Sequence, residues 1–195
     1  MFANRFTAVI DACVLAGALK RNILLSLAEA ELFRPRWSDR ILDEAAVAIE
    51  KILIEAADGA EQRAKRARSA VEQAFPEALV IDYAHIERGL TGLPDPNDCH
   101  VVAAAVKAKA SIIVTENLCD FPQNVLQPLE IESKTADNFI ADTINLKPSL
   151  ALSAMRRMRQ RFKNPAMTAD ELLIRMEERG LMDTADILRE NIESL

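Results

Sequence analysis

Four acidic residues lie far apart in the sequence, and each stands beside an apolar run or within an amphipathic segment. Asp11 comes directly after the apolar run FTAVI, and Asp120 follows the run IIVT within the loop ENLCD. Asp98 precedes a run rich in alanine and valine, and Glu44 lies in an amphipathic segment. Gathered at one place, such carboxylates would repel one another unless a cation joined them. Because oxygen ligands favour hard cations and the chain has only two histidines, we expect Mg²⁺ or Mn²⁺ rather than zinc.

The stretch LPDPNDCHVVAAA contains one of these acids and also carries helix-start signals. Asp95 suits an N-cap, Pro96 suits the first helical position, and Asp98 suits the first turn, where a negative charge meets the helix dipole. The other three acids have structural interpretations too, as a helix cap, an exposed helix face and an Asx turn. We interpret Asp95 as structural, with a possible supporting role, and Asp98 as a ligand. His100 is expected to face solvent or to cap the first helical turn.

Strand and helix signals alternate along the chain. Strands are predicted at FTAVI, at 78–83 (ALVIDY), at 112–115 (IIVT) and near Leu129 (LEIES). Helices are predicted after Asp11, after the cap Ser38, over about 60–75 and after Asp95, with a loop at 34–37. This order indicates an α/β fold with a parallel sheet flanked by helices, and such sheets bind ligands at the carboxyl ends of their strands.

From Thr135 onward the pattern becomes helical, and Thr168 with Glu171 predicts a capping box. We expect one α/β domain over 1–146 and an all-helical C-terminal extension over 147–195. The segment 147–163 has six basic residues and no acid. It could contact phosphate, or it could be a solvated helix face.

The pieces VIDACVL, WSDRILDE, LPDPNDCHVVAAAV and IIVTENLCDFP, in this order and spacing, resemble the PIN-domain ribonucleases. The likeness covers about residues 5 to 135 and is greatest to the VapC-type toxins of bacterial toxin–antitoxin pairs. It implies catalytic and metal-binding roles for Asp11, Glu44, Asp98 and Asp120. Many family members have an aspartate where this chain has Asn117, so Asp120 would take the acidic role. Asn117 could be a neutral ligand, and Thr115 could orient a ligand or be structural.

The same resemblance implies a metal-dependent ribonuclease, the toxin of a type II toxin–antitoxin system that acts on tRNA or ribosomal RNA. The ion, Mg²⁺ or Mn²⁺, would activate water and neutralise charge on the phosphate. Its partners would be the RNA, a small cognate antitoxin and a second copy of the chain in a homodimer. Basic residues must help the RNA approach an acidic pocket, and Arg34, Arg36 and Arg40 are sequence neighbours of the acidic elements.

The composition of the chain restricts the class of protein to which it can belong. The net charge of −6 argues against a nonspecific nucleic-acid coat, and the three cysteines lack the spacing of a zinc knuckle or a disulfide framework. We expect each cysteine to be a small packed hydrophobe. No apolar run approaches the length of a membrane span, and Met1 to Ile10 has no signal-peptide profile, so a soluble cytoplasmic protein is expected.

Two other classes fit parts of the pattern. If the acidic pocket has degenerated, as Asn117 permits, the chain would be a PIN-like binding protein that does not cleave. An acid-phosphatase-like fold would use Asp11 as its nucleophile. That fold normally needs a second acid two residues later, where this chain has Cys13.

Overall fold

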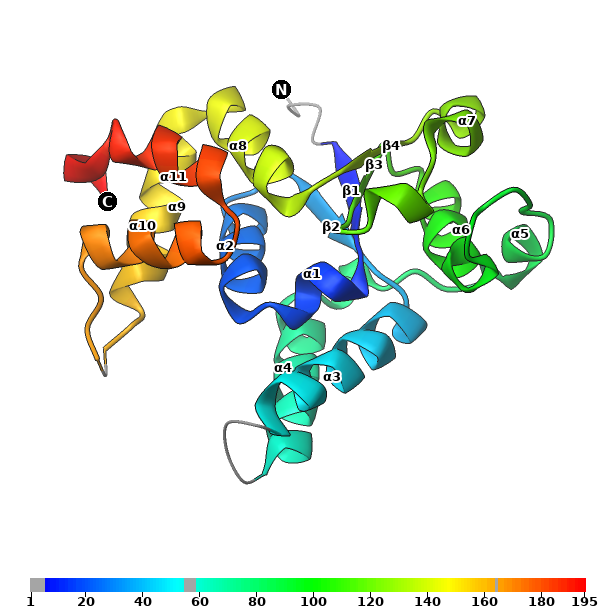
Figure 1. Ribbon diagram of the computed structural model, residues 1–195, viewed down its shortest axis with the longest axis horizontal. Coiled ribbons are helices and arrows are strands. Elements are labelled where there is room, and N and C mark those ends of the chain that lie inside the picture. The colour runs from blue at the N-terminus through cyan, green and yellow to red at the C-terminus, as the bar shows by residue number, and fades with distance from the viewer. Residues whose placement is uncertain (1–5, 55–58, 164) are drawn as a thin grey trace. The chain divides into compact units, whose positions relative to one another are not determined.

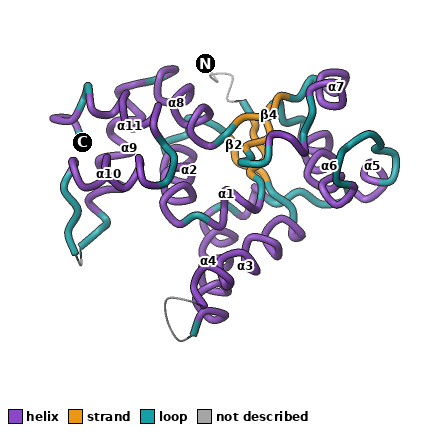
Figure 2. The backbone as a smooth tube through the Cα atoms, viewed as in Figure 1, coloured by secondary structure: helices purple, strands orange, loops and turns teal. Residues whose placement is uncertain are grey.

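A parallel sheet of four strands organises one of two compact units. The computed structural model describes residues 6–54, 59–163 and 165–195. The strand order is β2–β1–β3–β4 (Figure 1), and the strands lie together in Figure 2. Their bounds are β1 Thr7–Ile10, β2 Arg34–Arg36, β3 Ile112–Val114 and β4 Glu132–Lys134. The predicted α/β class, with a parallel sheet, flanking helices and a helical C-terminal part, is confirmed.

The position of β1 inside the sheet explains why its residues are apolar without alternation. Ala8, Val9 and Ile10 are at most 1% exposed, as expected of a parallel strand covered on both faces. Ile10 pairs with Val114 of β3, so the residues that follow these two strands, Asp11 and Thr115, come to the same edge of the sheet. The strand pairing therefore sets the first contact of the candidate site.

Two strand predictions need correction. The second strand in chain order is β2, where a loop was predicted at 34–37, and not 78–83. Pro35 lacks an N–H donor, but β2 is an edge strand, where a proline is tolerated. Residues 79–81 make a single bridge, between Leu79 and Trp37, and Asp82 turns the chain away with a φ of 56°. The strand predicted near Leu129 begins later, at Glu132, after a 3-10 turn.

The same unit contains helices that surround the sheet. The helices are α1 Ala12–Ala16, α3 Asp39–Ile54, α4 Ala60–Ala74, α5 Ala84–Glu87, α6 Cys99–Ala108 and α7 Gln123–Leu126. Short 3-10 helices are η1 Pro76–Ala78, η2 Pro96–Asp98, η3 Leu118–Asp120 and η4 Gln127–Leu129. Helices α3 and α4 lie side by side as a hairpin (Figure 1), and α6 packs against β1 and β3. The predicted helix after Asp11 is broken at Gly17 into α1 and α2.

Helices build the second unit. They are α2 Ala18–Glu29, α8 Ala136–Leu146, α9 Pro148–Gln160, α10 Ala169–Glu178 and α11 Met182–Arg189, with η5 Ile192–Ser194. Its core includes Phe33 packed edge-on against Phe139, with ring centroids 4.9 Å apart. The capping box predicted for Thr168 and Glu171 is present. Asp137 of α8 accepts hydrogen bonds from the backbone of Asp183 and Thr184 and so fixes the start of α11.

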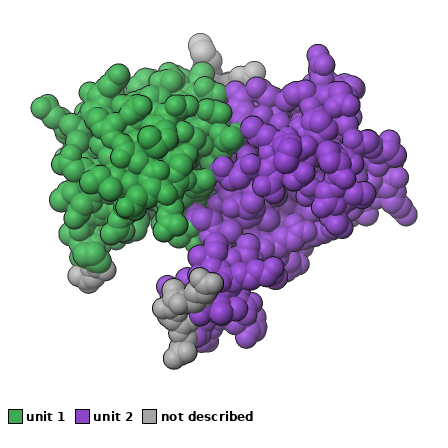
Figure 3. All heavy atoms as spheres, viewed as in Figure 1, with its two compact units in different colours: residues 1–5, 18–33, 135–195 green, residues 6–17, 34–134 purple. Residues whose placement is uncertain are grey.

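The chain divides into these units at positions different from the predicted domain limit. One unit contains 6–17 and 34–134, and the other contains 18–33 and 135–195 among the described residues (Figure 3). The predicted limit between 146 and 147 stays a prediction. Met1 to Arg5, part of the predicted first domain and of the stretch examined for a signal peptide, lie outside the described residues. Within the part that the structure describes, none of the helices has the length and apolar character that a membrane crossing requires.

The N-cap of α3 gives a test of how this helix is held. Ser38 is fully buried, and its hydroxyl accepts a hydrogen bond from the backbone N–H of Ile41 at 3.2 Å. We expect Ser38→Ala to lower the free energy of unfolding in urea by about 1 kcal/mol, because the N–H loses its acceptor. Ser69→Ala, at an exposed position of α4, is the matched control and should change it by less than about 0.5 kcal/mol. Equal stability of both variants would contradict this role of Ser38.

Candidate active site

Asp11 is the most enclosed acid of the candidate site. Its side chain is 6% exposed, just after β1. One carboxylate oxygen, Oδ1, accepts from the backbone N–H of Ala12 at 2.6 Å, and Oδ2 accepts from the Thr115 hydroxyl at 2.7 Å. The Cys13 thiol lies 3.2 Å from Oδ2 and donates to it. Asp11 is therefore both the N-cap of α1, as its structural interpretation had it, and a carboxylate fixed across two strands.

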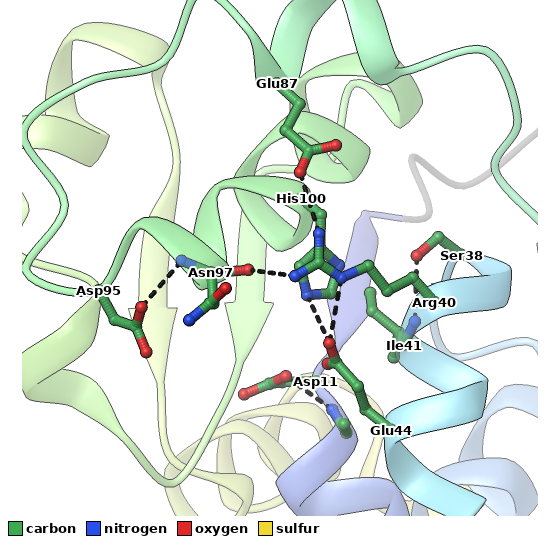
Figure 4. Close-up of polar contacts among 10 residues, drawn as sticks. Asp11, Ser38, Arg40, Ile41, Glu44, Glu87, Asp95, Asn97 and His100 are labelled. Atoms are coloured by element: carbon green, nitrogen blue, oxygen red, sulfur yellow. Dashed lines mark hydrogen bonds and ion pairs between the residues drawn. The ribbon is translucent and has the colours of Figure 1, made fainter.

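Glu44 reaches the same region from α3. Its Oε1 atom accepts a hydrogen bond from Nε of Arg40 at 3.2 Å and lies 3.3 Å from Nε2 of His100 (Figure 4). The pKa of Glu44 is raised, first by burial and then in part by the charges of Asp11 and Asp43, while Arg40 acts in the opposite direction. The charge of Glu44 is thus linked to that of Asp11.

Asp98 shows that the acids come together. It is the last residue of η2, directly before α6. Burial raises the pKa of Asp98 to about 6, and the neighbouring carboxylates add to this rise. These carboxylates, in order of effect, belong to Asp11, Asp95, Asp120 and Glu44. Asp98 therefore interacts electrostatically with the other three acids predicted from the sequence.

The other predicted residues lie around this group. Asp95 is the N-cap of η2 and accepts from the backbone N–H of Asn97 at 2.8 Å, as predicted. Asp120 ends η3, where its Oδ1 lies 3.7 Å from the Cys119 thiol. The backbone N–H of Asn117 donates to the Thr115 hydroxyl at 3.1 Å, and the residue is exposed. Thr115 therefore connects the Asn117 loop to Asp11.

A divalent cation suits the chemistry of this group. Among residues 6–54, 59–163 and 165–195, no three histidine, cysteine, aspartate or glutamate side chains are arranged to hold a metal ion as they stand. The donors are carboxylate oxygens, which hard cations prefer, and the repulsion felt by Asp98 is of the kind that a cation relieves. The residue types fit the ion, and the ligand roles of the four acids stay predictions.

The three predicted RNA-binding arginines differ in their contacts. Arg34 is exposed on β2. Arg36 donates to the backbone carbonyl of Glu77 at 2.7 Å and to that of Pro35 at 3.3 Å. Arg40 makes ion pairs within the chain, although its side chain is 41% exposed. RNA binding by these arginines stays a prediction.

Two groups beside the acids differ from expectation. His100 is buried, at 1% exposure. Of the two alternatives expected for it, the one in which it faces solvent is therefore wrong. Burial, with the charge of Arg40, lowers the pKa of His100 to about 4, so the imidazole is neutral at pH 7. Among the cysteines, Cys99 is buried as expected, whereas Cys119 is exposed and Cys13 is only half-buried. Burial and the charge of Asp11 raise the pKa of Cys13 to about 11, so its thiol stays protonated at neutral pH.

The sequence contains a signal for the burial of His100, the apolar run VVAAA that follows it. His100 stands within the segment Cys99 to Ala105, every residue of which is buried, and a histidine there is enclosed with its neighbours. The partner of Arg40 could also have been found, because Arg40 and Glu44 are four residues apart on one helix face.

Comparison with known families agrees with this geometry. Residues 7–118, more than half of the chain, match the model of a family described as PIN domain. The chain belongs to the PIN domain family. The match contains β1, α3 and α6, and with them Asp11, Glu44 and Asp98, while Asp120 lies just beyond it. The predicted likeness to this family is confirmed.

The helical part of this PIN-domain chain has its own match. Residues 136–190 match a family described as VapC50 C-terminal domain. A protein of Mycobacterium tuberculosis (strain ATCC 25618 / H37Rv) named "Putative ribonuclease VapC50" is 36% identical over 76 residues, which are 39% of this chain and 45% of that protein. The chain thus spans less than half the length of this relative. No solved structure matches the chain.

The repulsion at Asp98 has a measurable consequence for stability. Because its pKa is higher in the folded protein than the ordinary value of 3.8, the ionised form at pH 7 opposes folding, and this effect declines as the pH falls below about 6 and is gone below about 3.8. We expect Asp98→Asn to raise the free energy of unfolding at pH 7, without metal, by about 1 kcal/mol, since solvent screens this partly exposed group. Urea unfolding in EDTA measures it.

The control is Asp82→Asn, at an exposed turn of the same unit where asparagine tolerates the positive φ. Its stability should stay within about 0.5 kcal/mol of the unchanged chain. If Asp98→Asn destabilised the metal-free protein at pH 7, the repulsion at Asp98 would be disproved.

Proposed function

We propose that the chain is a divalent-metal-dependent endoribonuclease of the VapC type, which hydrolyses phosphodiester bonds in RNA. The observation that carries the proposal is the interaction of Asp98 with Asp11, Asp120 and Glu44, which belong to separate parts of the sequence. The match to the PIN domain family and the name of the mycobacterial relative support the same activity.

The chain's own residues would act by holding charge in place. The Thr115 hydroxyl and the Ala12 N–H fix the Asp11 carboxylate, and Arg40 restrains Glu44. We propose that Asp11, Glu44, Asp98 and Asp120 hold Mg²⁺ or Mn²⁺. When bound, such an ion lowers the pKa of water and neutralises charge on the phosphate. The free Cys13 thiol is not required as a nucleophile, and its raised pKa is consistent with that.

RNA must approach a site that is itself acidic. Arg34 and Arg36 lie on the edge strand β2, beside β1, the strand that Asp11 follows. We propose that they bind backbone phosphates at the rim of the site, because cationic side chains supply much of the affinity for a polyanion. With a net charge of −6, the chain as a whole gives no such attraction.

The VapC-type matches support a proposal for the biological setting. We propose that the chain is the toxin of a type II toxin–antitoxin pair, that tRNA or ribosomal RNA is its target, and that a small antitoxin neutralises it. A homodimer belongs to the same proposal.

In the helical unit, Arg159 donates to the carbonyl of Met167 and Arg161 pairs with Glu29. These two arginines thus already make contacts within the chain, and the phosphate-binding alternative for 147–163 would depend on its other basic residues.

The activity can be tested with end-labelled RNA. The full chain is incubated with single-stranded RNA, tRNA or ribosomal RNA in Mg²⁺, Mn²⁺ or EDTA. We expect cleavage with either metal and none in EDTA, because charge on the phosphate is then no longer neutralised. Asp11→Asn and Asp98→Asn should each lower the cleavage rate at least about 100-fold. Asp82→Asn should cleave like the unchanged chain.

Two results would refute the proposal. Cleavage that persists in EDTA, or in both Asp11→Asn and Asp98→Asn, would show that another group or a contaminant is responsible. RNA binding with no cleavage in any metal would instead establish the alternative of a PIN-like binding protein, for which Asn117 is the motivating feature.

A further inference from the structure

His100 is a buried polar side chain whose surroundings include one acid of the candidate site. It lies in the first turn of α6, two residues after Asp98, and is 1% exposed. Its Nε2 atom is 3.3 Å from Oε1 of Glu44, on α3 (Figure 4). Its Nδ1 atom has no hydrogen-bond partner among the described residues. The contact with Glu44 is thus the polar interaction that explains a histidine at this position.

Arg40 donates a hydrogen bond to the same glutamate oxygen. Its Nε donates to Oε1 of Glu44 at 3.2 Å, its Nη1 to Oε1 of Glu87 at 3.1 Å, and its Nη2 to the carbonyl of Asn97 at 3.2 Å (Figure 4). One guanidinium therefore connects α3 to α5 and to η2, the turn that ends at Asp98. Its planar fork of donors suits three fixed acceptors.

These contacts restrict Glu44 in a particular way. Both fall on Oε1, and within the described part of the chain Oε2 makes no polar contact. A glutamate on a helix otherwise samples several rotamers about its three side-chain torsions. Two contacts on one oxygen restrict the direction of the carboxylate and leave the second oxygen for a ligand.

We propose that His100 and Arg40 are positioning residues that orient Glu44 towards a cation shared with Asp11 and Asp98. The inference rests on the proposed function. His100 acts through the N–H on Nε2, and Arg40 also keeps the turn before Asp98 at a fixed distance from α3. Residues that orient metal ligands in this way typically affect metal affinity or activity 10- to 100-fold.

The test compares two substitutions of His100 in the full chain. His100→Gln can place an amide N–H near the position of Nε2, whereas His100→Leu has a similar apolar bulk and no donor. His85→Gln, at the exposed second histidine on α5, is the matched control. Urea unfolding shows whether each variant is folded. Titration with Mn²⁺ alone, followed by electron paramagnetic resonance of the free ion, measures metal affinity without RNA.

We expect His100→Leu to bind Mn²⁺ about tenfold more weakly and to lower kcat for RNA cleavage about tenfold or more, with KM for RNA unchanged. His100→Gln should recover most of both losses. Arg40→Met, at a partly exposed position, should show the same two losses, and it decides the question if His100→Leu does not fold.

The contrary results are distinct. Unchanged Mn²⁺ affinity and kcat in folded His100→Leu would overturn the inference. Losses that His100→Gln does not recover would assign the effect to packing and would overturn it as well. An unchanged chain that neither binds Mn²⁺ nor cleaves RNA would overturn the proposed function, and this inference with it.

Discussion

The buried carboxylate of Asp11 is the constraint on which the candidate site depends. A charged group at 6% exposure is stable only when hydrogen bonds replace its lost hydration, and Asp11 receives them from Ala12 and Thr115. The Ala12 donor is the first residue of α1, which Asp11 caps. The Thr115 donor is within reach because β1 and β3 are parallel neighbours in the register that pairs Ile10 with Val114. A shift of that register by one residue would move Thr115 away from Asp11.

A second physical feature is repulsion held in place by the fold. The pKa of Asp98 is raised first by burial and then by the charges of neighbouring acids, Asp11 foremost, so the folded chain keeps charges together that would separate in water. Such an arrangement lowers stability, and proteins commonly retain it where function needs it. Arg40 offsets part of the cost, since it joins Glu44 to Glu87 and to the turn before Asp98. The same fold that brings the acids together thus also limits how far they can move apart.

Much of this arrangement could be predicted from the sequence, because local signals agreed with the fold. Apolar runs located β1 and β3, Ser38 located the start of α3, and the order of the elements indicated that Asp11 and Asp120 follow the carboxyl ends of strands in one parallel sheet. Pro35 concealed β2, because a proline usually marks a loop and its tolerance here depends on the strand being at the sheet edge. The run at 78–83 has strand-like composition, but the positive φ of Asp82 ends it after one bridge.

Side-chain partners were harder to predict than elements. The contact of His100 with Glu44 and the contacts of Arg40 with Glu87 and Asn97 depend on how α3, α5, η2 and α6 pack, and residue types alone do not determine that packing. The separation of α2 from α1 at Gly17 likewise depends on tertiary structure, since the apolar spacing continues across the glycine. Periodicity therefore located the helices, and their contacts set the roles of the polar residues between them.

The most direct test of a cation shared by these acids is a crystal of the full chain soaked in Mn²⁺ and measured near the manganese absorption edge. We expect an anomalous difference peak in contact with carboxylate oxygens of Asp11 and Asp98, with Glu44 or Asp120 completing the protein ligands. A fully soaked crystal with no peak among these four acids, or with its Mn²⁺ bound only by other residues, would contradict it.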